Sequence, residues 1–167
     1  MAIVKASYTR NGAVAKAATR YIEHRPGKEG AKLWRTLFNA DGKVSRQEVY
    51  AMIEQAEPGS YFFRLVISPD PRGEDQGKNL SLRDLTEKTM HRLEDRFQRP
   101  LLWVAAVHDD HAAHRHIHAI AITPGRLTVS DFQRLRAAAT EAALEQLQQL
   151  DVARERSQEQ SGGLELG

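Results

Sequence analysis

The stretch from Leu101 to Thr123 constrains the fold of this chain more than any other part of the sequence. Two apolar segments, 101–108 and 116–123, each have the length of a strand and are rich in alanine and β-branched residues. A connection of seven residues joins them. We expect the two segments to pair as an antiparallel hairpin at the centre of a sheet.

The ends of these segments hold an unusual concentration of histidine. Five of the seven histidines of the chain lie in the run HDDHAAHRHIH, from His108 to His118. In a hairpin centred near Ala112, His108 lies opposite His116, and His118 follows on the same face. Opposite residues are about 4.5 to 5.5 Å apart and same-face neighbours about 6.6 Å, so three imidazoles converge on one divalent cation. The spacing predicts that His108, His116 and His118 bind a metal ion.

The remaining residues of the run lie in the connection between the two strands. For His111 and His114 we expect solvated side chains or contacts with the ligands. A carboxylate commonly accepts the second N–H of a ligand imidazole. Asp109 or Asp110 can do this or orient a nucleophile, and the prediction favours Asp110. The alternative is a solvated histidine-rich loop that binds nothing.

The rest of the chain alternates between strand and helix patterns. Residues 26–43 are expected to form a long basic connection, and the polar loop 69–79 is too hydrophilic for a core. We predict an α+β fold with a mainly antiparallel sheet, in one domain over residues 1–150, with 151–167 as a disordered tail or the start of a linker. Further strands are expected at 3–8 and 61–68, and helices at 11–25, 45–57, 81–97 and from Ser130.

The amino-acid composition excludes several kinds of functional site. The 167 residues include no cysteine, which excludes disulfides, thiolate nucleophiles, zinc fingers and iron–sulfur clusters. The net charge is only +2, but residues 1–50 carry ten Lys and Arg against four Asp and Glu, which favours a polyanionic partner. No apolar run approaches the roughly 20 residues of a membrane span, so we expect a cytoplasmic protein.

A phosphate diester is a natural substrate for a metal held by three neutral histidines. A tyrosine phenol placed opposite such a metal can attack the phosphorus. The chain has four tyrosines, and all of them precede the histidines: Tyr8, Tyr21, Tyr50 and Tyr61. A metal-bound water is the alternative nucleophile.

Three segments make the chain similar to relaxases, the Mob-type HUH endonucleases that nick plasmid or integrative-element DNA at its transfer origin. AAVHDDHAAHRHIHAIAI resembles the three-histidine motif, AVAKAATRYIEHR the tyrosine motif, and FFRLVISPDP an intermediate motif whose serine approaches the DNA. The resemblance covers most of residues 1–150. It implies that Tyr21 is the nucleophile, with Tyr8 as the alternative, and that Ser68 approaches the DNA. Two extra residues in the histidine motif make His114 an alternative ligand.

The resemblance also implies a fold and a reaction. The expected fold is a central sheet of about five strands flanked by helices. The expected reaction is strand-specific nicking of single-stranded DNA with Mg²⁺ or Mn²⁺, through a 5′-phosphotyrosine and a free 3′-OH that can rejoin. Partners would be DNA at a transfer origin and other relaxosome proteins. The residues expected to hold backbone phosphates near Tyr21 are Arg20, His24, Arg25, Lys28 and Lys32.

Some alternatives stay open at this point. A phosphodiesterase that uses a bound water would have the same ligands, and a non-catalytic DNA-binding accessory or initiator protein would have the same fold. Trp34 and Phe38 could stack on bases, although the prediction favours core packing for both.

Overall fold

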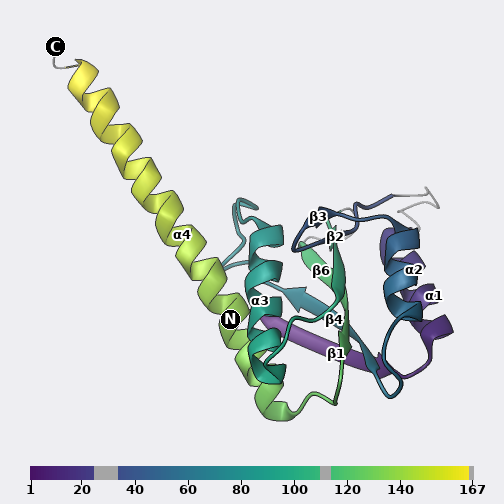
Figure 1. Ribbon diagram of the computed structural model, residues 1–167. Helices are drawn as coiled ribbons and strands as arrows, with labels where there is room; N and C mark the ends of the chain where they lie inside the picture. Colours follow the sequence, from purple (N-terminus) through teal and green to yellow (C-terminus); the bar gives the residue numbers. More distant parts are fainter. Residues whose placement is uncertain (25–33, 110–113, 166–167) are drawn as a thin grey trace.

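The computed structural model describes residues 1–24, 34–109 and 114–165. Its described part is an α+β fold with one antiparallel sheet of six strands in the order β1-β4-β6-β5-β2-β3 (Figure 1). The strands are β1 Ile3–Thr9, β2 Phe38–Asn39, β3 Gly42–Lys43, β4 Tyr61–Ser68, β5 Trp103–His108 and β6 His116–Thr123. The helices are α1 Gly12–Glu23, α2 Arg46–Glu54, α3 Leu82–Phe97 and α4 Val129–Glu165.

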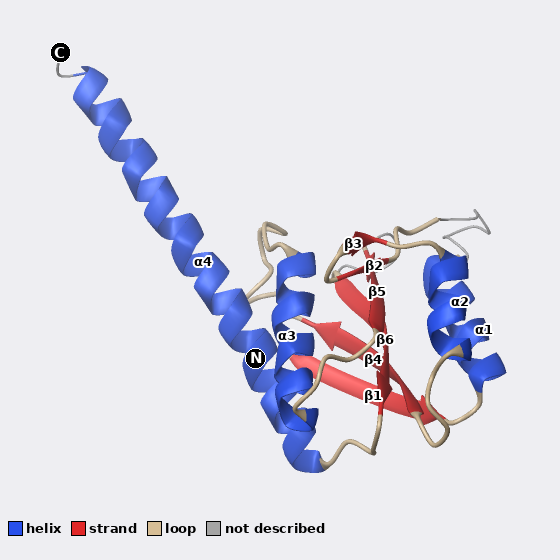
Figure 2. Ribbon diagram, in the orientation of Figure 1, coloured by secondary structure: helices blue, strands red, loops and turns tan. Residues whose placement is uncertain are grey.

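The helices form two layers, one on each face of the sheet (Figure 2). On one face α1 and α2 pack over Val104, Ala106 and Ile120. On the other face α3 and the first half of α4 pack over residues such as Leu65 and Ile117. Side chains alternate between the faces along each strand, because successive Cβ atoms of a strand point to opposite sides. The predicted α+β class, with a central sheet flanked by helices, is confirmed.

Polar side chains fix where three of the helices begin. Asn11, Ser45 and Ser81 are the N-caps of α1, α2 and α3, and each side chain accepts a hydrogen bond from the backbone N–H three residues on. Ser45 and Glu48 form a capping box, since the Glu48 carboxylate in turn accepts from the Ser45 N–H. The caps fix the first turns of α1 and α2, and apolar side chains such as Ile22 and Val49 pack these helices against the sheet.

The sheet has one strand more than the predicted number of about five. Residues 26–43 were expected to form only a connection, but β2 and β3 lie within it, and Phe38 of β2 pairs with Ala105 of β5. Strands of two residues are too short for alternation to reveal them. Phe38 is buried and packs edge-on against Trp103, as predicted, whereas Trp34 is 69% exposed, so the prediction of core packing for Trp34 is wrong.

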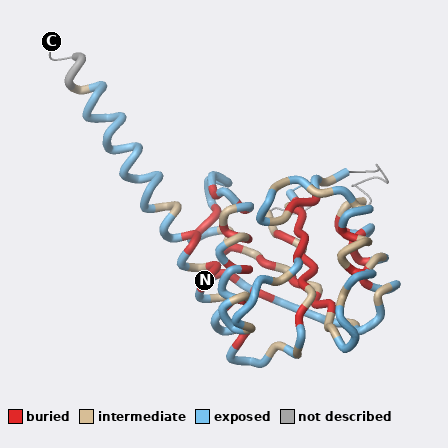
Figure 3. Tube along the Cα trace, viewed as in Figure 1, coloured by how far each residue is buried: buried red, intermediate tan, exposed pale blue. Residues whose placement is uncertain are grey.

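The C-terminal helix is longer than the sequence predicted. Residues 151–165 continue α4, where a disordered tail or the start of a linker was expected. Residues 151–161 are all exposed, and this part of α4 projects away from the sheet (Figure 3). Residues 151–165 include three glutamates, two glutamines and two arginines, which favour a helix without tertiary packing. No helix in the described residues has both the length and the apolar character of a membrane span.

The polar loop after β4 also differs from its prediction, because two of its carboxylates are buried. Glu74 is 4% exposed and Asp75 is 6% exposed. Both are paired with hydrogen-bond donors: the Asp70 N–H donates to Glu74, and Arg115 donates to Asp75. Composition alone missed this burial, since the partners that offset its desolvation cost lie elsewhere in the chain.

Candidate metal centre

The two central strands bring three histidines to one face of the sheet. In the β5–β6 ladder His108 pairs with His116, and Ala106 pairs with His118, which confirms the predicted register. The ring centroids are 5.3 Å apart for His108 and His116, 4.1 Å for His108 and His118, and 4.9 Å for His116 and His118. One nitrogen from each ring lies within 4.8 Å of the other two. This histidine triad could hold a metal ion.

His108 is oriented by the backbone of α1. The ring is buried, at 2% exposure, and its Nε2 lies 3.1 Å from the carbonyl oxygen of Ile22. A carbonyl only accepts, so Nε2 carries the proton and donates it to this bond. The buried Nδ1 then carries the lone pair, and it has no hydrogen-bond partner among the described residues. Ligand histidines are held in this way, with one nitrogen bonded to a carbonyl and the other left for the metal.

The surroundings keep His108 neutral. Burial lowers its pKa from the usual 6.5 to about 3, and electrostatic interactions with His118 and Arg35 act in the same direction. The hydrogen bond to Ile22 opposes this change only in part. A neutral imidazole is the form that binds metal ions.

The lowered pKa predicts how the stability of the metal-free protein depends on pH. Between about pH 7.5 and about pH 5 the unfolded chain takes up a proton at His108, whereas the folded protein does not, so stability falls as the pH falls. We expect a loss of about 2 kcal/mol in the free energy of unfolding over this range. Urea denaturation in EDTA at several pH values measures it.

Two variants isolate the contribution of His108. His108→Asn should lose most of this pH dependence, whatever its effect on stability at neutral pH. His91→Asn serves as the control, because the His91 side chain is 76% exposed and lies on α3. Equal slopes of stability against pH for the wild type and His108→Asn would contradict the prediction.

Tyr21 lies beside the residue that orients His108. It is the residue before Ile22 in the last turn of α1, and its ring is 43% exposed. The guanidinium of Arg64 lies 5.8 Å from the centroid of this ring. Arg64 comes from β4, two residues before Val66, which pairs with His118. The end of α1 therefore brings Tyr21 to the sheet face of the histidine triad.

Ser68 lies on the same face and at the same end of the sheet. The β4–β6 ladder pairs Val66 with His118 and Ile67 with Ile117. Continuing this register by one residue places Ser68, the last residue of β4, beside His116. Ser68 therefore lies near the histidine triad, and its expected approach to the DNA stays a prediction.

Two of the predicted alternatives lie apart from the triad. Tyr8 belongs to the opposite face of the sheet, where its ring packs against Tyr61 and Phe63 and its hydroxyl accepts a hydrogen bond from Arg126. His114 is exposed and does not belong to the metal-capable group found in the described residues.

The residues predicted to hold phosphates are only partly within the described chain. Arg20 is exposed in the last turn of α1, on the helix that carries Tyr21. His24 is the C-cap of the same helix, and its Nε2 lies 3.1 Å from the Glu23 carboxylate. The other predicted residues of the site lie outside the described part of the chain: Arg25, Lys28, Lys32, Asp110 and His111.

Sequence reasoning missed the group that orients His108. It expected a carboxylate, Asp109 or Asp110, at the second nitrogen of a ligand, but for His108 this position is taken by the Ile22 carbonyl. A backbone carbonyl leaves no trace in a sequence. Asp109 instead lies 3.6 Å from the Lys78 ammonium.

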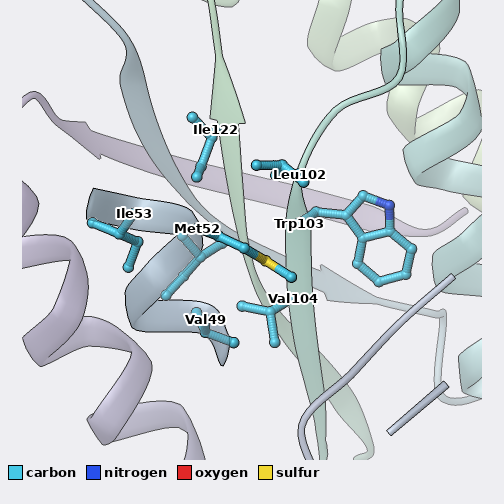
Figure 4. A pocket seen from close by; sticks show the side chains of 8 residues that line it. Val49, Met52, Ile53, Leu102, Trp103, Val104 and Ile122 are labelled. Carbon is cyan, nitrogen blue, oxygen red and sulfur yellow. The ribbon is translucent and has the colours of Figure 1, made fainter. Parts of the chain in front are cut away.

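The apolar cavity between α2 and the central strands has no catalytic or metal-binding side chain in its lining. Its lining has no charged side chain, and the side chains in Figure 4 are hydrocarbon apart from the Met52 sulfur and the Trp103 indole nitrogen. The residues that line it are Val49, Met52, Ile53, Leu102, Trp103, Val104, Ile120 and Ile122.

Comparisons of the chain with protein-family models, with curated proteins and with solved structures gave no match.

Proposed function

We propose that this protein is a metal-dependent DNA-nicking and rejoining transesterase of the relaxase kind. In this proposal His108, His116 and His118 hold Mg²⁺ or Mn²⁺, and Tyr21 attacks the scissile phosphate. The observation that carries the proposal is the orientation of His108. Its buried Nδ1 has no hydrogen-bond partner among the described residues, because Nε2 is bonded to the carbonyl of the residue next to Tyr21.

The three histidine ligands suit a metal ion that binds an anionic substrate such as a phosphate. Three neutral imidazoles contribute no negative charge, so a divalent ion held by His108, His116 and His118 would supply positive charge to neutralise the phosphate and the departing oxygen. His108 is kept neutral by its burial, which favours binding at physiological pH. Arg35 adds a positive charge near the triad, where it also attracts a phosphate.

In the proposed reaction the Tyr21 hydroxyl gives up its proton to water as its oxygen bonds to phosphorus. The bond from phosphorus to the 3′-oxygen of the preceding nucleotide breaks, and this oxygen takes a proton from water and leaves as a 3′-OH. The product is a 5′-phosphotyrosine. Attack by a 3′-OH on the same phosphorus reverses the reaction and rejoins the strand. Arg64 fixes the Tyr21 ring during attack, through its cation–π contact.

The proposed substrate is single-stranded DNA at a transfer origin of a plasmid or integrative element. The basic excess of residues 1–50 supports a polyanionic substrate. Arg20 and Ser68, both near the proposed reaction centre, would contact the strand. We also propose that the protein binds other relaxosome proteins and acts in the cytoplasm.

A covalent-trapping experiment tests the proposal. The protein is mixed with a pool of labelled single-stranded oligonucleotides, with Mn²⁺ or with EDTA, and run on a denaturing gel. We expect a covalent protein–DNA band that forms only with Mn²⁺. Nicking without a covalent band would favour a phosphodiesterase that uses a bound water. Tight strand binding without any cleavage would favour a non-catalytic DNA-binding protein.

A further inference from the structure

The loop between β4 and α3 is fastened to the strand that carries two of the three histidines. We call residues 69–80 the clasp loop. In it, Asp75 accepts two hydrogen bonds from Arg115, from Nε at 3.0 Å and from Nη2 at 2.7 Å. Nη2 also donates to the Leu80 carbonyl at 3.0 Å. The side chains are almost removed from water, at 13% exposure for Arg115 and 3% for Asp75.

Backbone hydrogen bonds hold Asp75 in place. The Asp70 carbonyl accepts from the N–H groups of Glu74 and Asp75, both at 2.9 Å. The Glu74 carboxylate in turn accepts from the Asp70 N–H at 2.7 Å. Lys78, which has the left-handed φ of 51°, donates its N–H to the Asp75 carbonyl. Arg115 is therefore bound to a loop whose own shape is fixed.

The clasp loop contacts the hairpin on both sides of its last ladder pair. That pair is His108 with His116. Arg115 directly precedes His116, and the Lys78 ammonium lies 3.6 Å from Asp109, which directly follows His108. Seven residues separate the two strands, a length that does not impose the register of a tight two-residue turn.

We infer that Asp75 and Arg115 are a positioning pair that holds His116 in register with His108. This inference rests on the proposed metal centre. A buried ion pair is costly to desolvate and is weak evidence for stability, but fixing one register is its best-attested use. Without the pair, the start of β6 can fray or slip, and a slip of one residue would turn both His116 and His118 to the other face.

The test compares two variants that make the same chemical change. Asp75→Asn removes the charge from the clasp pair. Asp131→Asn removes it from a matched pair, because Asp131 is 2% exposed and accepts from Arg96 at 2.9 Å, between α3 and α4. Isothermal titration of each variant with Mn²⁺ gives the affinity, and thermal unfolding gives the stability.

We expect both variants to unfold at a lower temperature, but only Asp75→Asn to lose Mn²⁺ affinity, by about tenfold or more. Arg115→Lys keeps the charge without the two-pronged geometry and should fall between the wild type and Asp75→Asn. If the pair had only a structural role, Asp75→Asn would unfold at a lower temperature but would bind Mn²⁺ as tightly as Asp131→Asn. This result would overturn the inference.

Amide hydrogen exchange of the metal-free proteins tests the positioning role without relying on the proposed metal function. In Asp75→Asn, exchange at His116 and Ile117 should become about tenfold faster or more, while Ala121 at the other end of β6 is unchanged. If the wild type binds no Mn²⁺ but this local change occurs, the proposed metal function fails and the positioning role stands. Unchanged exchange at His116 and Ile117 refutes the positioning role.

Discussion

Replacing His118 with glutamine should abolish tight binding of divalent metal. His118 is the member of the triad closest to His108, with ring centroids 4.1 Å apart, so its loss leaves two ligands on facing strands. We expect the affinity for Mn²⁺ to fall by at least about 100-fold, more than the loss expected from removing a residue that only orients a ligand. Isothermal titration at neutral pH measures the change.

A second histidine variant is the control for this result. His114→Gln changes an exposed histidine of the same run that is not a member of the triad, and it should bind Mn²⁺ within about twofold of the wild type. Near-ultraviolet circular dichroism shows whether each variant keeps its packing. If His114→Gln lost as much affinity as His118→Gln, the alternative ligand would replace one member of the proposed set.

Replacing Tyr21 with phenylalanine should remove DNA nicking while leaving DNA binding intact. The ring keeps its place beside Arg64, so only the hydroxyl that would bond to phosphorus is lost. We expect the nicking rate to fall by at least about 10³-fold, as for the loss of other covalent nucleophiles. The rate is measured on a labelled oligonucleotide that the wild type cleaves, and binding is measured by fluorescence anisotropy.

Tyr8→Phe is the matched control, since it deletes one hydroxyl from a tyrosine of almost equal exposure, 43% in each case. Tyr8 lies on the opposite face of the sheet from the histidines and should keep the wild-type nicking rate. A Tyr21→Phe protein that still nicks at the wild-type rate would indicate a bound water as nucleophile. Loss of nicking in Tyr8→Phe alone would reverse the assignment.

The central part of the fold could be predicted because the sequence patterns that indicate it lie within short segments of the chain. Apolar runs of strand length mark β4, β5 and β6, and the equal spacing of His108 and His116 about the connection fixes their pairing. Side chains that cap helices, such as Ser45, mark where helices begin. The alternation of side chains along a strand then predicts that the three histidines share one face of the sheet.

Other features depend on contacts between distant residues and could not be predicted. The Ile22 carbonyl that orients His108 comes from a segment 86 positions earlier in the chain. The burial of Asp75 depends on Arg115, which is 40 residues away. The helical continuation of α4 beyond residue 150 follows from helix propensity without an apolar face, and sequence periodicity detects only the apolar face.

Mass spectrometry of the trapped protein–DNA adduct tests the central claim most directly. The wild-type protein is incubated with a cleavable single-stranded oligonucleotide and Mn²⁺, the DNA is trimmed with nuclease, and the tryptic peptides are sequenced. The account predicts one nucleotide-bearing peptide with the added phosphate on Tyr21, absent when EDTA replaces Mn²⁺. Phosphate on any other residue, or cleavage of the DNA with no modified peptide, would contradict it.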